Sequence, residues 1–205
     1  GILIALQINN LNEQRKENLK SKIYREKIIN DLIADTLNIN SLIKDCRDME
    51  MEGESYFSYF NQENIDIDKL IDSSKKLKMG FIRYFPVNYT YLDMQSSGNS
   101  NLLNVEQKNT LIELSSTQDL IQIIIEKTIT RSQDQLSLKD NVFGYPNDFY
   151  SKMDIKVSEE KKLQWLLHQH LLFKNNLILY SYLKRFGQTI KDQSKKAILT
   201  LKDTS

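Results

Sequence analysis

The scarcity and the spacing of proline and glycine constrain this chain more than any other feature of its sequence. The 205 residues include two prolines and six glycines, and long stretches contain neither residue. Helix interiors exclude proline and disfavour glycine, whereas a β-rich fold needs frequent turns that recruit both. A chain of this length is also able to bury a core. The sequence therefore predicts an all-α fold with a small number of long helices.

Hydrophobic periodicity places the first helix between the start of the chain and about Glu52, directly before Gly53. One face repeats at intervals of three or four residues, through Ile28, Leu32, Thr36, Ile39, Ile43 and Cys46. A flanking face is polar, and we expect it to be solvated: Lys27, Asp31, Asp35, Asn38, Asp45 and Asp48. At 1.5 Å per residue, about 50 helical residues form a rod about 75 Å long, which we expect to project beyond a bundle.

Shorter helices are expected at 54–60, from Asp66 or Asp68 to Lys78, and at 88–97, where Gly98 ends the helix. Asn104 and Gln107 form a capping box for a long helix that reaches about Leu138. Its apolar stripe contains Leu111, Leu114, Ile121, Ile125, Thr128, Ser132 and Leu136.

Ser158, followed by two glutamates, starts the last long helix, in which Gly187 marks a bend or a split. The expected buried face contains Leu163, Leu166, His170, Phe173, Leu177, Tyr180, Leu183, Ile190, Ala197 and Leu201. We therefore predict an elongated antiparallel helical bundle with three long helices plus short helices.

The first residues, GILIAL, form an apolar segment that is followed by Gln7, Asn9, Asn10 and then a run of charged residues. A transmembrane helix needs about 20 apolar residues, so this segment cannot span a bilayer by itself. In one interpretation it packs into the bundle or forms a tail. In the other, the chain begins within a membrane helix, so that residues 1–10 are the C-terminal end of a transmembrane segment and residues 11–205 form a soluble helical bundle domain.

Two motifs carry a resemblance to a known family. GILIALQINNLNEQRK, with Leu11 at a position where the family usually has tryptophan, resembles the membrane-exit segment of an uncharacterised family of Bacteroidetes-type membrane proteins, domain of unknown function 6090. TYLDMQSSGN (90–99) is similar to a second family stretch at Thr90, Tyr91 and Ser96 to Asn99, but departs from it at residues 92–95. The resemblance implies an N-terminal membrane anchor and a helical domain covering essentially the whole chain, without a known activity.

Membrane orientation rests on the charges beside the apolar segment. Arg15, Lys16, Lys20 and Lys22 follow it, and positive-inside counting alone places them in the cytoplasm. Members of the family that the chain resembles carry a strongly basic segment before the helix, which implies the opposite side. We expect a single-pass protein of the inner membrane with its helical domain in the periplasm.

Charge and cysteine content exclude several classes of function. Lys and Arg total 28 against 27 Asp and Glu, a balance that gives no electrostatic basis for a nucleic-acid partner. Cys46 is the sole cysteine, which excludes an intrachain disulfide and a multi-cysteine zinc site. His168 and His170 point away from each other on a helix, so we expect no shared metal, and we expect His170 to be a core residue bonded to a carbonyl or an acid.

Other polar motifs have structural explanations that we favour. Asp66 and Asp68 present two carboxylates to a cation if the segment is extended, but acids before a helix are more often caps, and Asp68 is the expected cap here. Ser96 and Ser97 have no paired base in the sequence and read more simply as part of a helix end. The sequence contains no phosphate-binding loop, nucleophile elbow or zinc-protease motif. We predict no cofactor and no catalytic residues.

Two aromatic clusters at helix breaks are the best candidates for a ligand pocket or a protein interface. They comprise Phe81, Arg83, Tyr84, Phe85, Tyr89 and Tyr91 around Pro86, and Phe143, Tyr145, Phe149 and Tyr150 around Gly144 and Pro146. Aromatic residues at helix breaks also plug the ends of bundles, which is the interpretation we favour. The expected function is therefore that of a membrane-anchored, non-enzymatic helical domain that senses a ligand or binds a protein, including a second copy of itself. The alternative is a structural or scaffolding component of an envelope or defence assembly.

Overall fold

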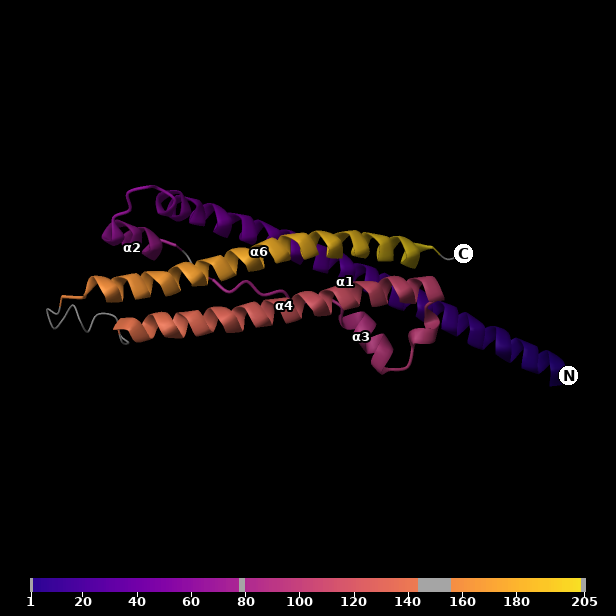
Figure 1. Ribbon diagram of the computed structural model, residues 1–205. Helices are drawn as coiled ribbons and strands as arrows, with labels where there is room; N and C mark the ends of the chain where they lie inside the picture. Colours follow the sequence, from indigo (N-terminus) through magenta and orange to yellow (C-terminus); the bar gives the residue numbers. More distant parts are fainter. Residues whose placement is uncertain (1, 78–79, 144–155, 204–205) are drawn as a thin grey trace. The chain divides into compact units, whose positions relative to one another are not determined.

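The computed structural model describes residues 2–77, 80–143 and 156–203, and in these ranges the chain is helical and has no strand (Figure 1). The long helices are α1 (Ile2–Phe60), α4 (Val105–Phe143) and α6 (Glu159–Lys202). The short ones are α2 (Ile67–Lys75), α3 (Tyr89–Ser96) and a 3₁₀ helix, η1 (Ser100–Leu102). The predicted all-α class, with three long helices and several short ones, is confirmed for the part of the chain described.

Helix α1 is longer than the sequence suggested, because the break expected at Gly53 is wrong. The helix continues through this glycine to Phe60. A glycine inside a helix costs about 1 kcal/mol relative to alanine. The turn that follows Gly53 buries Tyr56 completely, and burying a large apolar side chain stabilises a fold by about 1.5–3 kcal/mol. The gain from packing exceeds the local cost, so the helix does not end.

The starts of α2, α4 and α6 are each fixed by a side-chain cap. The Asn104 and Gln107 side chains each accept a hydrogen bond from the other's backbone N–H, as in a capping box, and Ser158 Oγ accepts one from the backbone of Lys161. At α2 the cap is Asp66, which accepts from the N–H of Lys69, so the expectation of Asp68 as the cap is wrong. Helix α6 passes through Gly187 without a split.

The chain divides into two compact units, and each contains a segment of every long helix. Unit 1 is formed by residues 1–40, 85–119 and 187–205, and unit 2 by residues 41–84 and 120–186. Consequently α3 and η1 belong to unit 1, and α2 belongs to unit 2.

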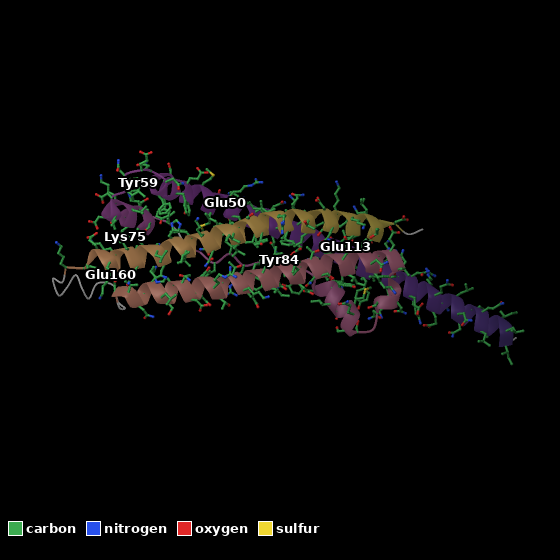
Figure 2. The ribbon with its side chains drawn as sticks, in the orientation of Figure 1. Glu50, Tyr59, Lys75, Tyr84, Glu113 and Glu160 are labelled. Atoms are coloured by element: carbon green, nitrogen blue, oxygen red, sulfur yellow. The ribbon has the colours of Figure 1, made fainter. Side chains whose placement is uncertain are left out.

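In unit 1, α4 and α6 pack antiparallel. The Gln107 side chain at the start of α4 donates to the carbonyl of Thr200 over 3.0 Å. Two turns further on, Glu113 projects from α4 (Figure 2) and accepts from Lys196, which lies earlier in α6. The side chains buried in this unit include Ile28, Leu32, Ile39, Met94, Leu103, Leu111, Leu114, Ile190, Ala197 and Leu201.

In unit 2, α6 runs antiparallel to both other long helices. Tyr56 and Glu50 of α1 contact His170 and Lys184 of α6, so later residues of α1 meet earlier residues of α6. Ser132 and Gln135 of α4 are paired with Asn176 and His168 of α6 in the same descending order. Helices α1 and α4 are therefore parallel to each other. The predicted antiparallel packing holds for α6 against α1 and for α6 against α4, but not for α1 against α4.

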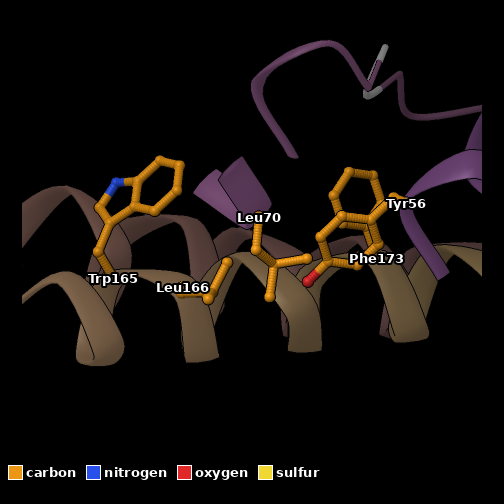
Figure 3. Packing of buried hydrophobic residues seen from close by; sticks show 5 residues of the cluster. All are labelled: Tyr56, Leu70, Trp165, Leu166 and Phe173. Atoms are coloured by element: carbon orange, nitrogen blue, oxygen red, sulfur yellow. The ribbon is translucent and has the colours of Figure 1, made fainter. Parts of the chain in front are cut away.

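The core of unit 2 is partly aromatic. Tyr56, Leu70, Trp165, Leu166 and Phe173 form one buried cluster to which α1, α2 and α6 contribute (Figure 3). Trp165 was not among the residues expected on the buried face of α6, whereas Leu163, which was, is exposed. The rest of the predicted face, from Leu166 through Phe173 to Leu201, is buried or half-buried, so the difference is confined to the first turns of α6.

The N-terminal end of α1 is apolar and uncovered. Ile2, Leu3 and Ile4 have exposed fractions of 80%, 78% and 63%, and Leu6, Ile8 and Leu11 are also exposed. Among the described residues, no helix has an apolar stretch of the length that crossing a bilayer requires.

Candidate functional site

The structure separates the first aromatic cluster into buried and exposed members. Tyr84 and Tyr91 are 4% and 6% exposed, whereas Phe85 and Tyr89 are 66% and 68% exposed. Phe81 and Arg83 are exposed as well. Tyr89 and Tyr91, which both belong to unit 1, border different cavities. Burial of Tyr84 and Tyr91 agrees with packing at a helix break, while a role in ligand binding stays a prediction.

The second aromatic cluster is described only at its first member. Phe143 ends α4 in unit 2, with its ring centroid 6.2 Å from that of Trp165. Tyr145, Phe149 and Tyr150 lie outside the described residues.

Two aspartates of α1 hold the segment that carries the first cluster. Asp35 Oδ1 accepts from the backbone N–H of Val87 over 2.9 Å, and Asp31 Oδ2 accepts from that of Thr90 over 2.8 Å. The Gln118 side chain of α4 donates to the second oxygen of Asp35. Asp35 was expected on a solvated face, but it is completely buried, so that expectation is wrong. Its burial follows from these hydrogen bonds, which replace water around the carboxylate.

The end of α3 is fixed by Gly98, which has a φ of 72°. The N–H of Asn99 bonds to the carbonyl of Met94, and that of Gly98 to the carbonyl of Gln95. This double pattern is the Schellman motif, and its positive φ explains the glycine. The role predicted for Gly98 as a helix terminator is confirmed.

The Asn99 side chain then joins α3 to α1. Its Oδ1 accepts from Lys20 Nζ over 2.7 Å, and its Nδ2 donates to Ser97 Oγ and to Tyr24 Oη. Next to it, Ser21 Oγ donates to the carbonyl of Leu102. The motif SSGN therefore lies against the first third of α1, although about 75 to 80 residues separate the two segments in sequence.

Between α1 and α3, in unit 1, lies a surface groove of about 380 Å³. It is lined by Lys20, Ile23, Tyr24, Lys27, Tyr89, Thr90 and Asp93. Tyr24 Oη donates to Asp93 Oδ2 over 3.3 Å, which ties the wall formed by α1 to the wall formed by α3. We refer to this site as the α1–α3 groove.

The lining of the α1–α3 groove favours binding over catalysis. It offers two ammonium groups against one carboxylate, together with hydroxyl groups and the apolar surfaces of Ile23 and Tyr89. It contains no histidine or cysteine, and thus no usual pair of nucleophile and base. The surplus of positive charge suits an anionic group, and the exposed Tyr89 ring supplies a flat contact surface beside it.

The histidines lie in unit 2 and have separate partners. His170 Nδ1 is 3.0 Å from Tyr56 Oη, and its ring lies 4.4 Å from that of Phe60 and 5.5 Å from that of Phe57. Burial, and secondarily the charge of Lys174, lowers the pKa of His170. His170 is a packed residue as predicted, but its partner is a phenol instead of a carbonyl or an acid. His168 Nδ1 is paired with Gln135.

Cys46 is buried in unit 2 beside charged groups that are partly exposed. Burial, followed by the nearby Glu50, raises the pKa of the Cys46 thiol to about 12. Burial likewise raises the pKa of Tyr180 to about 12. A thiol with such a pKa is protonated at neutral pH and is a poor nucleophile. Glu50 forms an ion pair with Lys184 beside it.

The acidic pair at the start of α2 does not form a cation site. Asp66 caps the helix, and Asp68 accepts from Lys162 of α6 over 2.8 Å. Within the described ranges, no three side chains of the histidine, cysteine or acidic types come together as metal ligands would.

Sequence reasoning missed most of the α1–α3 groove. Of its residues, Tyr89 belonged to a predicted site, while Lys20 and Lys27 were read as part of a charged run. The one available signal was the stretch 90–99, which contains Thr90 and Asp93. Comparison of the chain with models of protein families, with curated proteins and with solved structures gave no match.

Proposed function

We propose that this chain is a non-enzymatic helical domain, tethered to a membrane through the start of α1, whose α1–α3 groove binds an anionic ligand or an acidic segment of a protein partner. The observation that carries the proposal is the groove itself. Lys20, Lys27 and the Tyr89 ring surround it, and the hydrogen bonds of Tyr24 and Asn99 hold its walls in place. A preorganised surface of this kind binds without ordering flexible segments first.

The groove is testable with small anions that carry a ring. We would titrate ¹⁵N-labelled chain with phenyl phosphate and with benzoate, and follow the amide signals of residues 20–27 and 89–93. Lys27→Gln is expected to weaken any saturable shift at least threefold, since it removes a charge that lines the groove. Lys22→Gln makes the same change in charge on α1 outside the groove lining and is the control. Shifts that do not saturate, or that both variants weaken equally, contradict the proposal.

The tether is supported by the exposed apolar residues at the start of α1. A helix that is apolar on all sides is stable when protein or lipid surrounds it, and none of the described residues covers Ile2, Leu3 or Ile4. Resemblance of residues 1–16 to a membrane-exit segment supports the same proposal and implies an inner-membrane protein with its domain in the periplasm.

Flotation with phosphatidylglycerol vesicles tests this part of the proposal. The chain is expected to float with the vesicles, and the pair Leu3→Asp with Leu6→Asp is expected to reduce the bound fraction at least fivefold. Ile123→Asp places a charge at an exposed apolar position of α4 and is the control. If the control lowers the bound fraction as strongly, the start of α1 is not the membrane-binding element.

A scaffolding role is the second candidate, and one specific observation favours it. Ile33 and Leu37 of α1 are exposed beside Leu199 of α6, and together they border an apolar groove in unit 1. Exposed apolar patches of this kind mark protein interfaces. Association into species larger than a dimer in analytical ultracentrifugation, without any ligand, would favour this role over ligand sensing.

A further inference from the structure

Helix α1 carries a second stripe of residues on the face opposite to its packed face in unit 1. Ile28 and Asp35 mark the packed face, since both are buried. Successive residues of an α-helix are rotated by about 100°, which places the second stripe about half a turn away. The stripe consists of Leu19, Ile23, Glu26, Asn30, Ile33 and Leu37, all of them exposed.

The spacing of this stripe is that of a coiled-coil seam. Its members follow one another at steps of four, three, four, three and four residues. Such steps alternate between the d and a positions of a heptad, with Leu19 at d and Ile23 at a. The four apolar members are between 44% and 65% exposed, so apolar seam positions lie in water in the isolated chain.

We propose that the stripe pairs with the same stripe of a second copy, the two α1 helices lying parallel and in register. In this arrangement Asn30, at an a position, faces Asn30 of the other copy. A single asparagine at such a position selects parallel strands in register, because a parallel pair shifted by one heptad opposes its amide to the apolar Ile23 or Leu37. The charged member, Glu26, lies at d and faces Glu26 of the other copy, and the two Lys27 side chains at the flanking e positions offset these like charges.

The surroundings of the stripe enlarge the surface available to the second copy. A groove of about 380 Å³ runs beside Ile33 and Leu37, and Ile198 and Leu199 of α6 line its other side. The groove belongs entirely to unit 1. A helix seated on the stripe covers apolar atoms of both α1 and α6, which gives the interface more width than a two-helix seam alone.

The parallel direction rests on the tether proposed above, while the pairing itself does not. Two copies anchored through the start of α1 present their N-termini to the same membrane surface, so their α1 helices run in the same direction. An antiparallel pair of the same stripe would instead oppose Leu19 to Leu37, Ile23 to Ile33 and Glu26 to Asn30, and would send the two N-termini to opposite ends.

Disulfide trapping of the full chain in lipid-free buffer tests both pairing and direction. Cys46 is buried, so Asn30→Cys adds the one readily accessible thiol. Mild oxidation is expected to cross-link most of this variant into a covalent dimer, whereas Glu126→Cys, at an exposed position of α4, stays monomeric. Cross-linking between a Leu19→Cys copy and a Leu37→Cys copy, without Leu19→Cys homodimers, would establish the antiparallel pair and overturn the proposal.

Sedimentation equilibrium gives an independent measurement. The unmodified chain is expected to dimerise, and Ile33→Asp is expected to weaken association at least tenfold, with Ile123→Asp as the matched control on α4. A chain that stays monomeric at all concentrations, or an Ile33→Asp variant that dimerises normally, refutes the pairing. Ile33 lies outside both the α1–α3 groove and the start of α1, so Ile33→Asp is expected to leave the vesicle flotation and the groove titration unchanged, and a failure here is distinguishable from a failure of the proposed function.

Discussion

Among single residues, Asp35 best shows how a polar side chain comes to be completely buried. The helical repeat places Asp35 on the same face as the polar residues Asp31 and Asn38, so the local sequence gives no reason for burial. Each of its oxygens receives a hydrogen bond, one from the backbone of Val87 and one from the side chain of Gln118. Charge-assisted hydrogen bonds of this kind offset the desolvation of the carboxylate. Asp35 therefore joins α1, α4 and the segment before α3 within unit 1.

Replacing Asp35 by asparagine is expected to destabilise the fold by about 1–3 kcal/mol. Both carboxylate oxygens accept hydrogen bonds, and asparagine replaces one of these oxygens by an NH₂ group, so that one N–H donor then faces another donor. Asp48→Asn makes the same change at an exposed position of α1, where a change below about 0.5 kcal/mol is expected. Urea unfolding followed by circular dichroism measures both values. Equal effects of the two substitutions would show that the buried hydrogen bonds of Asp35 contribute no stability.

His170 makes a distinct prediction about pH. Burial disfavours its charged form, so the pKa in the folded state lies below its ordinary value of 6.5. The unfolded chain then binds more protons below that value than the folded chain does, and the free energy of unfolding falls as the pH drops through about 6.5. Above this range both states are neutral and the contribution vanishes.

The measurement is the free energy of unfolding between pH 7.5 and pH 5.5, in the parent chain and in His170→Gln. The parent is expected to lose more stability over this range than the variant. His168→Gln is the control, because this histidine lies on the same helix with a different partner. Parallel pH profiles for the parent and His170→Gln would refute the assignment.

At the scale of the helices, Gly53 and Gly98 illustrate two opposite uses of glycine. Gly53 lies inside α1, where the nearest atoms to an added Cβ belong to the Phe57 ring at 3.9 Å. Gly98 lies at the end of α3 with a φ of 72° and has open space around it. Both positions have room for a methyl group, but only the helical backbone of Gly53 accommodates alanine without strain, because Gly98 has a positive φ.

Gly53→Ala is therefore expected to stabilise the chain by about 0.5–1 kcal/mol, since alanine restricts the unfolded chain and favours the helix. Gly98→Ala is expected to destabilise it by about 1–2 kcal/mol because of the left-handed backbone. Thermal unfolding of the two variants beside the parent provides the comparison. A loss of stability in Gly53→Ala would mean that the helix around residue 53 is strained.

At the scale of the whole chain, the three long helices are continuous through both units. Loss of either unit interrupts every one of these helices, so the units are expected to unfold together. We expect near-ultraviolet and far-ultraviolet circular dichroism to give coincident urea transitions. Two separate transitions, with Asp35→Asn shifting one and Phe173→Ala shifting the other, would show independent units.

Much of the fold could be predicted because its determinants are local. The scarcity of turn residues specified helices, and the capping box of Asn104 and Gln107 fixed where α4 begins. Gly98 marked the end of α3 because a Schellman turn requires a positive φ. Apolar spacing also identified Ile28, Leu32 and Ile39 as buried residues. Each of these features depends on residues within a few positions of one another.

The tertiary structure alone decided which polar and aromatic residues are used. Tyr56 pairs with His170, and Lys20 contacts Asn99, across 114 and 79 positions of sequence. The burial of Asp35 likewise depends on Gln118, which lies 83 positions away. The α1–α3 groove arises in the same way, since its two walls come from distant segments. Periodicity states which face of a helix is buried, but the partner that covers this face is set by the path of the chain, and a hydrogen bond becomes possible only when that path brings donor and acceptor together.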